Sequence, residues 1–120
     1  MNYVGIDIGS SAAKVAIINN DIVSNFVIPT GWSSSETAEA IEERLSVMGL
    51  NVHDKSNVLI ESTGYGRRAV SYSDMQITEI TCHGRGAVEM VGNNCTVIDI
   101  GGQDTKIVSI DNGAVSDFLM

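Results

Sequence analysis

The first thirty residues alternate between apolar and polar positions in a way that predicts strands. Residues 2 to 8, 13 to 18 and 22 to 28 each alternate or form a short apolar run, as half-buried strands do. The segments between them are Gly9-Ser10-Ser11 and Asn19-Asn20-Asp21, whose residue types are favoured in tight turns. We therefore predict a three-stranded antiparallel meander at the start of the chain.

The pattern then changes to a helical period. Ser33 followed three positions later by Glu36 is typical of a capping box, and Gly49 is a suitable residue to end a helix. Three apolar residues between these signals fall on one predicted face: Ile41, Leu45 and Met48. Further along we expect a strand at residues 57 to 60, a loop at 62 to 66, a short helix near 66 to 72, a strand near 76 to 80 and a helix near 83 to 91.

An internal repeat decides the larger organisation. Residues 6 to 28 return at residues 98 to 120 with a constant offset and no gap, and Lys14 returns as Lys106. Both copies begin with an apolar strand that ends in Asp-x-Gly, namely Ile6-Asp7-Ile8-Gly9 and Ile98-Asp99-Ile100-Gly101. A repeat kept in register indicates a duplicated structural unit.

The repeat predicts two parts of unequal length. We expect a first α/β lobe at residues 1–92 and the opening meander of a truncated second lobe at residues 93–120, so that the chain is the front part of a longer two-lobed protein. The second meander would have no helix of its own. Four isoleucines would then lack a covering element, namely Ile98, Ile100, Ile107 and Ile110, and we expect self-association, with exchange of the C-terminal strands as one route.

Composition narrows the class of protein. A chain of 120 residues with 43% hydrophobic and 18% charged residues is globular. The formal net charge of −8 disfavours nucleic acid and anionic membranes as partners. With no leader-like N-terminus and no apolar run of about 18 residues, a cytoplasmic location is expected. Cys82 and Cys95 match neither a disulfide framework nor a zinc pattern and are interpreted as reduced thiols.

The two hairpin turns are candidate phosphate sites. A turn of small residues such as Gly9-Ser10-Ser11 can expose backbone N–H groups in a concave nest, and Asp7 beside it suits Mg²⁺ or a water bound to Mg²⁺. Asp99 and Gly101-Gly102-Gln103 repeat the arrangement, so two such loops facing one another would bind one nucleotide from both sides. A single Asp-x-Gly is more often a turn than a ligand site, but its return in register favours phosphate and metal contact.

Two other patterns suggest different chemistry. Residues 64 to 69 fit the G-x-G-x-x-A dinucleotide fingerprint, with Glu79 at a distance suitable for a ribose contact. Ser71, Ser73 and Asp74 stand where that motif needs a long helix, so the fingerprint is weak. His83 beside Cys82 resembles a metal pair, but adjacent helical residues point about 100° apart, and packing or capping is the preferred interpretation for both.

Four motifs together resemble a known family. They are Gly5-Ile6-Asp7-Ile8-Gly9-Ser10, Thr63-Gly64-Tyr65-Gly66-Arg67, Cys82-His83 and the most specific one, Val97-Ile98-Asp99-Ile100-Gly101-Gly102-Gln103-Asp104. The chain is similar over nearly its whole length to the BadF/BadG/BcrA/BcrD ATPase family, the ATP-dependent activators of 2-hydroxyacyl-CoA dehydratases and benzoyl-CoA reductases. This resemblance implies a ribonuclease H-like α/β fold with a mixed sheet, as in the actin, sugar kinase and Hsp70 superfamily.

The resemblance also implies site residues. Asp7 and Asp99 would serve Mg²⁺ and catalysis, and Gln103 and Lys106 would lie near the γ-phosphate of ATP or ADP. The remaining nucleotide-binding residues would be Gly9, Ser10, Ser11, Lys14, Gly101 and Gly102.

In this family, ATP hydrolysis drives a low-potential electron from a [4Fe–4S] cluster, shared between subunits, into the partner enzyme. The implied partners are an acyl-CoA dehydratase or reductase component, a ferredoxin- or flavodoxin-type electron donor and a second copy of the chain. The cluster ligands and the adenosine-binding loop are expected beyond Met120, so neither Cys82 nor Cys95 is assigned to the cluster. The chain alone is expected to hydrolyse ATP poorly.

Two alternatives stay open at this point. One is a non-catalytic assembly or nucleotide-binding module whose strands pair with another chain. The other is a sugar- or acetate-kinase-like phosphotransferase of the same superfamily, which transfer of phosphate to a small-molecule acceptor would reveal.

Overall fold

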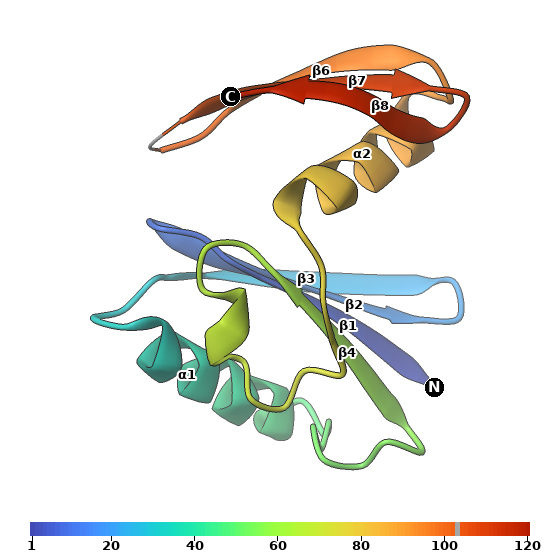
Figure 1. Ribbon diagram of the computed structural model, residues 1–120. Helices are drawn as coiled ribbons and strands as arrows, with labels where there is room; N and C mark the ends of the chain where they lie inside the picture. The colour runs from blue at the N-terminus through green and yellow to red at the C-terminus, as the bar shows by residue number, and fades with distance from the viewer. Residues whose placement is uncertain (103) are drawn as a thin grey trace. The chain divides into compact units, whose positions relative to one another are not determined.

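The computed structural model describes every residue of the chain except Gln103. The described chain forms two compact units, Met1–Ile77 and Thr78–Met120, each with its own sheet (Figure 1). The boundary between the units, after Ile77, lies before the boundary after residue 92 that the repeat suggests. The reason is that the helix at residues 79–90 packs against the second sheet rather than the first.

A five-stranded mixed sheet forms the first unit. Its strands lie in the order β3-β2-β1-β4-β5, and their bounds are β1 Asn2–Ile8, β2 Ala12–Asn19, β3 Ile22–Pro29, β4 Val58–Thr63 and β5 Met75–Gln76. The first three strands pair antiparallel, which confirms the predicted meander. β4 pairs parallel to both β1 and β5, so the sheet is mixed, as expected.

Helix α1 (Ser34–Val47) packs against one face of this sheet (Figure 1). The side chain of Ser33 accepts a hydrogen bond from the Glu36 N–H at 3.2 Å, so the predicted N-cap is confirmed. Ile41 and Leu45 are fully buried, but Met48 is exposed because it lies beyond the last helical turn. The face of the sheet beneath α1 is apolar, with Val4, Ile6, Ile8, Val15 and Ile17 in the core.

The region after β4 corrects several sequence-based boundaries. Ser62 and Thr63 belong to β4 and not to the loop, because they continue the parallel pairing with β1. The short helix is a single 3-10 turn, η1, at Arg67–Ala69. The strand expected near 76 to 80 ends at Gln76, because Thr78 is already the N-cap residue of helix α2 (Glu79–Met90). This helix therefore begins earlier than predicted. Neither helix in the described part of the chain is long and apolar enough to cross a membrane.

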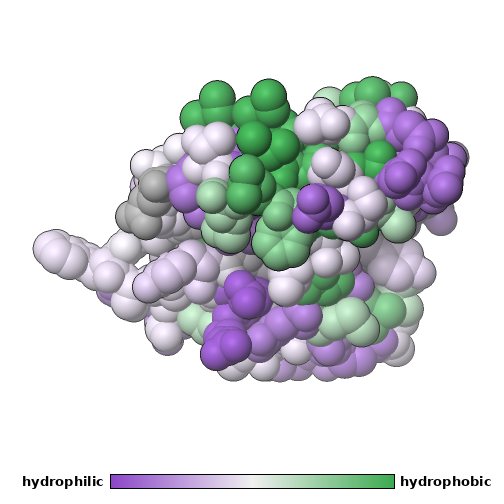
Figure 2. All heavy atoms as spheres, turned by 45° about the horizontal axis from the view of Figure 1, so that its top comes forward, coloured by the Kyte–Doolittle hydropathy of each residue, from purple (hydrophilic) through white to green (hydrophobic). Residues whose placement is uncertain are grey.

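Three antiparallel strands form the sheet of the second unit, in the order β6 (Cys95–Ile100), β7 (Thr105–Asp111) and β8 (Ala114–Leu119). Helix α2 packs against one face of it, so the expectation that no helix covers residues 95 to 120 is wrong. Ile110 is buried beneath this helix together with Val108. On the other face of this sheet, which α2 does not cover and which we call the outer face, apolar side chains gather (Figure 2). Its exposed residues include Ile98, Ile100, Ile107 and Leu119.

The repeat is confirmed at the level of the backbone. Asp7 lies opposite Lys14 in the β1–β2 ladder, and Asp99 lies opposite Lys106 in the β6–β7 ladder. The second turn of each meander places an asparagine at positive φ, with 54° at Asn20 and 51° at Asn112. The helices, however, cover opposite faces of the two repeats, because Ile6 and Ile8 are buried under α1 while their counterparts Ile98 and Ile100 are exposed.

Candidate functional site

The first cluster of candidate residues lies at the end of β1. Asp7 is 29% exposed, and its Oδ2 lies 3.7 Å from Nζ of Lys14 on the neighbouring strand. Opposite charges directly across an antiparallel ladder attract one another. The Lys14 ammonium also lies close to the first turn, since a Cβ built on Gly9 would be 3.1 Å from its Nζ. One carboxylate, one ammonium group and the glycine turn therefore meet here.

The first turn is held by hydrogen bonds at both ends. The N–H of Gly9 donates to the Ala12 carbonyl at 3.0 Å and closes the hairpin. Thr30 fixes the turn from outside, because its N–H donates to the Ser11 carbonyl at 3.1 Å and its hydroxyl to the Gly9 carbonyl at 2.8 Å. Neither the N–H of Ser10 nor that of Ser11 makes a hydrogen bond to another described residue. These two groups can therefore bind an anion.

Thr30 is a functional candidate that the sequence did not indicate. It follows the third strand and carries no motif, so only its position beside the turn reveals its role. Its two hydrogen bonds use carbonyl oxygens of the turn, which would otherwise repel an anion. A rigid turn with unpaired N–H groups is a preorganised anion site.

The carboxylate of Asp7 is backed by the loop after β4. Thr63 is the parallel neighbour of Asp7, and Gly64 follows it with a φ of 91°. A side chain on Gly64 would collide with Oδ1 of Asp7 and with the Ile8 carbonyl. The Arg67 guanidinium donates to the Gly64 carbonyl at 3.1 Å and closes this loop. The Thr-Gly-Tyr-Gly-Arg motif therefore supports Asp7.

This geometry disfavours the dinucleotide alternative. The glycines of residues 64 to 69 lead into the 3-10 turn η1 and not into the long helix that a dinucleotide motif requires. Glu79, the proposed ribose contact, instead accepts a hydrogen bond from Lys106 in the second unit at 3.2 Å.

The second cluster centres on Lys106. Its Nζ lies 3.7 Å from Oδ2 of Asp99, 3.2 Å from Oε2 of Glu79 and 3.2 Å from Oδ1 of Asp104. Its side chain is only 8% exposed, whereas that of Lys14 is 53% exposed. Burial acts to lower the pKa of Lys106, but the hydrogen bonds with Glu79 and Asp104 outweigh it and raise the pKa above its usual value. Lys106 is thus a cation held among carboxylates.

The glycine turn of the second repeat, after Gly101, is closed in the same way as the Gly9 turn of the first repeat. The N–H of Gly101 donates to the Asp104 carbonyl at 2.8 Å, in the position of the Gly9 to Ala12 hydrogen bond. Gly102 follows in the turn, and Gln103 lies outside the described residues, so its assignment to the γ-phosphate stays a prediction.

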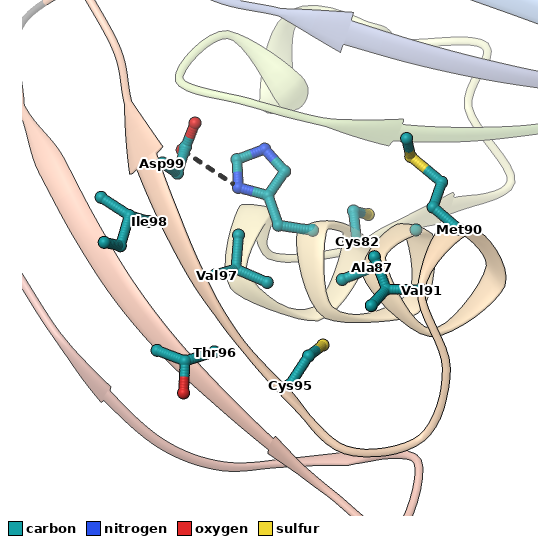
Figure 3. A pocket seen from close by; sticks show the side chains of 11 residues that line it. Cys82, Ala87, Met90, Val91, Cys95, Thr96, Val97, Ile98 and Asp99 are labelled. Carbon is teal, nitrogen blue, oxygen red and sulfur yellow. Dashed lines mark ion pairs between the residues drawn. The ribbon is translucent and has the colours of Figure 1, made fainter.

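His83 is a second residue whose role the sequence did not indicate. Its Nδ1 lies 3.2 Å from Oδ2 of Asp99, the ion pair drawn as a dashed line in Figure 3. Both side chains are about a third exposed. The sequence favours packing or capping for this residue, because nothing in it shows that residue 83 of a helix meets residue 99 of a strand. The contact is polar, and it involves Asp99, one of the two residues predicted to serve Mg²⁺.

His83 and Asp99 line a pocket of about 510 Å³ between α2 and β6. The rest of its lining is mostly apolar and includes Met90, Val91 and Val97. Cys82 and Cys95 also line it, and both are free, half-buried thiols. In the part of the chain that the structure describes, no three His, Cys, Asp or Glu side chains form a ready-made metal site.

Each unit therefore presents one strand-end aspartate, one cross-strand lysine and one small-residue turn. Magnesium usually binds through one or two protein carboxylates, and waters and phosphate oxygens complete its octahedron. The donor chemistry of Asp7 and Asp99 fits that ion, and the N–H groups of the first turn fit phosphate. The arrangement is chemically suited to a magnesium–phosphate ligand.

Comparison with known proteins agrees with this chemistry. Residues 4–120 match the BadF/BadG/BcrA/BcrD ATPase family. The chain is 40% identical over 123 residues to the 2-hydroxyisocaproyl-CoA dehydratase activator of Clostridioides difficile, a match that covers 100% of this chain and 46% of that protein. It is also 40% identical over 123 residues to the activator of lactoyl-CoA dehydratase of Anaerotignum propionicum, covering 100% of this chain and 47% of that protein. The chain thus spans about half the length of the curated relatives it matches.

A solved structure shows the same fold. The activator of the 2-hydroxyisocaproyl-CoA dehydratase from Clostridium difficile with bound ADPNP superposes with a TM-score of 0.81 at 37% identity. The superposition covers 99% of this chain and 45% of that one. The structural neighbours are proteins of the actin, sugar kinase and Hsp70 superfamily, so the predicted fold class is confirmed.

Proposed function

Because the chain belongs to the BadF/BadG/BcrA/BcrD ATPase family, we propose that it is the nucleotide-binding N-terminal part of an ATP-dependent activator of a 2-hydroxyacyl-CoA dehydratase. The observation that carries the proposal is the repeated Asp–Lys pair beside a small-residue turn, Asp7 with Lys14 and Asp99 with Lys106. A packing role would keep the apolar alternation of both strands but has little reason to keep both charges.

In the first unit, the N–H groups of Ser10 and Ser11 and the ammonium of Lys14 bind phosphate. Gly9 allows the phosphate to approach, because it has no side chain to fill the space below Lys14. Asp7 binds Mg²⁺ or a water of its coordination sphere, and Gly64 keeps the carboxylate in place from behind. The bound ion would supply positive charge that offsets the charge of the phosphates.

In the second unit, Asp99 is the equivalent carboxylate, and Gly101, Gly102 and Gln103 are assigned to phosphate binding as the counterparts of Gly9, Ser10 and Ser11. Gln103 is assigned to the γ-phosphate and, with Asp7 and Asp99, to hydrolysis. Lys106 differs from Lys14 because it is buried among three carboxylates. We assign it mainly to holding Asp99 and Asp104 in position, since contact with phosphate would require it to leave them.

The activity of the whole protein extends this proposal. ATP hydrolysis would drive one low-potential electron from a [4Fe–4S] cluster, shared in a homodimer, into a cytoplasmic acyl-CoA dehydratase or reductase, with a ferredoxin or flavodoxin as the donor. The support is the names of the relatives, which are activators of two 2-hydroxyacyl-CoA dehydratases. Cys82 and Cys95 are not assigned to the cluster, because two thiols fall short of the four ligands such a cluster needs.

Calorimetric titration of the complete natural protein with ATP, with and without Mg²⁺, tests the nucleotide site. We expect Asp7→Asn and Asp99→Asn each to raise the Kd of Mg–ATP by about tenfold or more, with a smaller effect on ATP alone. The control is Asp21→Asn, an exposed aspartate in the second turn of the first meander. Wild-type protein that does not bind Mg–ATP would contradict the proposal, as would equal effects of all three substitutions.

A further inference from the structure

The carboxylate of Asp99 contacts its neighbours through only one of its two oxygens. Both of its polar contacts use Oδ2, at 3.2 Å from Nδ1 of His83 and 3.7 Å from Nζ of Lys106. Oδ1 makes no hydrogen bond or ion pair with any described residue. The orientation of the carboxylate is therefore set from one side, and the other oxygen is available to a ligand.

The Nδ1 atom of His83 has no other use in the described structure. It is buried, and it makes no hydrogen bond of good angle, although Asp99 is at hydrogen-bond distance. Buried polar atoms are almost always satisfied in native proteins. Hydrogen bonds of functional sites are often poorly aligned before the ligand binds and become linear afterwards. The contact has the features of a bond that ligand binding aligns.

The fold places His83 there by a close helix–sheet approach. A Cβ built on the next residue, Gly84, would lie 2.6 Å from Cγ2 of Val115 and 3.2 Å from Cδ1 of Ile110. Only a residue without a side chain allows the backbone of α2 to come so near the sheet at this position. This approach brings the neighbouring residue, His83, to the edge strand β6 and to Asp99.

Among the residues that the structure describes, none supports the first aspartate in the way that His83 supports Asp99. Asp7 contacts Lys14 in the same register, but its other neighbour is the backbone of Gly64. The two aspartates therefore occupy equivalent positions in the repeat, but different residues hold their carboxylates in place. Packing alone would not require an imidazole at residue 83, because the lining of the pocket beside it is mostly apolar.

We propose that His83 is the positioning residue of Asp99. It donates its Nδ1 hydrogen to Oδ2 and so turns Oδ1 toward the Mg²⁺, or the Mg²⁺-bound water, of the bound nucleotide. This inference rests on the proposed function, because it needs Asp99 to serve the ion. Partners that orient a metal-binding group typically change metal affinity by about 10- to 100-fold when they are removed.

The test compares three substitutions of His83 in the complete natural protein. His83→Asn carries an amide N–H near the position of Nδ1, His83→Gln places its amide near the position of Nε2, and His83→Leu keeps the volume without a donor. The measurement is the Mg²⁺ concentration at half-maximal tightening of ATP binding. We expect an increase of about 10- to 100-fold for the Gln and Leu variants, and His83→Asn should recover most of the loss.

The control uses the second histidine of the chain. His53 also contacts a carboxylate, with Nε2 at 3.5 Å from Oε1 of Glu42, but it lies exposed in the first unit. His53→Gln should leave the Mg²⁺ requirement unchanged. In an Asp99→Asn background, His83→Gln should add nothing further, since the group that it positions is already lost.

Distinct results would overturn this inference. Equal Mg²⁺ requirements in wild type and in the His83→Gln or His83→Leu variant, whichever folds, would exclude a positioning role, because neither variant places a donor at the position of Nδ1. Equal losses in the Asn, Gln and Leu variants would show that a donor at the position of Nδ1 is not what supports Asp99, and would also contradict the inference. Failure of the wild-type protein to bind Mg–ATP would instead contradict the proposed function and is visible before any variant is made.

Discussion

The backbone of Gly64 lies directly against the carboxylate of Asp7, although the two residues are 57 positions apart in the sequence. Gly64 has a φ of 91°, and any side chain there would overlap Oδ1 of Asp7 and the carbonyl of Ile8. The glycine therefore serves two purposes, since it adopts a left-handed backbone and leaves room for the carboxylate. Its position explains why the loop after β4 belongs to the candidate site.

The first prediction concerns Gly64→Ala. We expect it to lower stability by more than about 1 kcal/mol and to weaken Mg–ATP binding, because the added methyl group displaces Asp7. Gly49→Ala is the matched control, since Gly49 has a φ of 88° and no atom within 4 Å of its built Cβ. It carries the same backbone strain without the collision. Equal losses of Mg–ATP affinity in the two variants, measured by calorimetry, would contradict the role given to Gly64.

The two repeated lysines should separate binding from stability. Lys14 is about half exposed, so Lys14→Met should change the free energy of unfolding by less than about 0.5 kcal/mol while weakening ATP binding. Lys106→Met leaves Glu79, Asp99 and Asp104 without their shared cation and should destabilise the second unit by about 1–3 kcal/mol. Urea unfolding and ATP titration of both variants check this. A stable Lys106→Met protein would show that the carboxylates do not depend on the lysine.

Asp74 should make the first unit sensitive to acid. Its Oδ2 accepts hydrogen bonds from Nζ of Lys55 at 2.9 Å and from the Ile60 N–H at 2.8 Å. The hydrogen bond from Lys55, helped by that from Ile60 and opposed by burial, holds the pKa of Asp74 below its usual value. Since the folded pKa lies below the unfolded one, the stabilisation is present above about pH 4 and is lost as the pH falls through the folded pKa.

The corresponding measurement is urea unfolding at about pH 7 and about pH 2. Asp74→Asn should lower the free energy of unfolding at neutral pH by less than about 1 kcal/mol, because the side chain is a third exposed. The difference in unfolding free energy between variant and wild type should become smaller in acid. Asp21→Asn serves as the exposed control and should show no such narrowing. A difference that becomes larger in acid would contradict the lowered pKa assigned to Asp74.

The outer face of the β6–β8 sheet should make the 120-residue chain associate with itself. Ile98 is 66% exposed and Ile100 is 78% exposed, and contiguous exposed apolar residues mark contact surfaces. Replacing both isoleucines with threonine keeps the strand propensity and should shift the chain toward monomer in sedimentation velocity experiments. Ile22→Thr, at a 72% exposed position of the first sheet, is the control. A wild-type chain that stays monomeric at high concentration would contradict this prediction.

The two meanders, their turns and the equivalence of the two Asp–Lys pairs could all be predicted from the sequence alone. This is possible because strand alternation, turn residues such as Asn20 and Asn112, and a repeat in register are all local or periodic signals. The helix cap at Ser33 was predictable for the same reason, since a cap depends on residues three positions apart. The identity of the charged candidates at the two strand ends needed no structure.

The face of each meander that a helix covers, and the residues that support the two aspartates, follow instead from tertiary packing. Helix α2 belongs to the second unit because Gly84 lets it approach Val115 and Ile110, which no periodicity in the sequence reveals. The same close approach brings His83 to Asp99, and the loop after β4 brings Gly64 to Asp7. These contacts join residues distant in the chain, and they depend on complementary shape in three dimensions, which a one-dimensional pattern of polar and apolar residues does not encode.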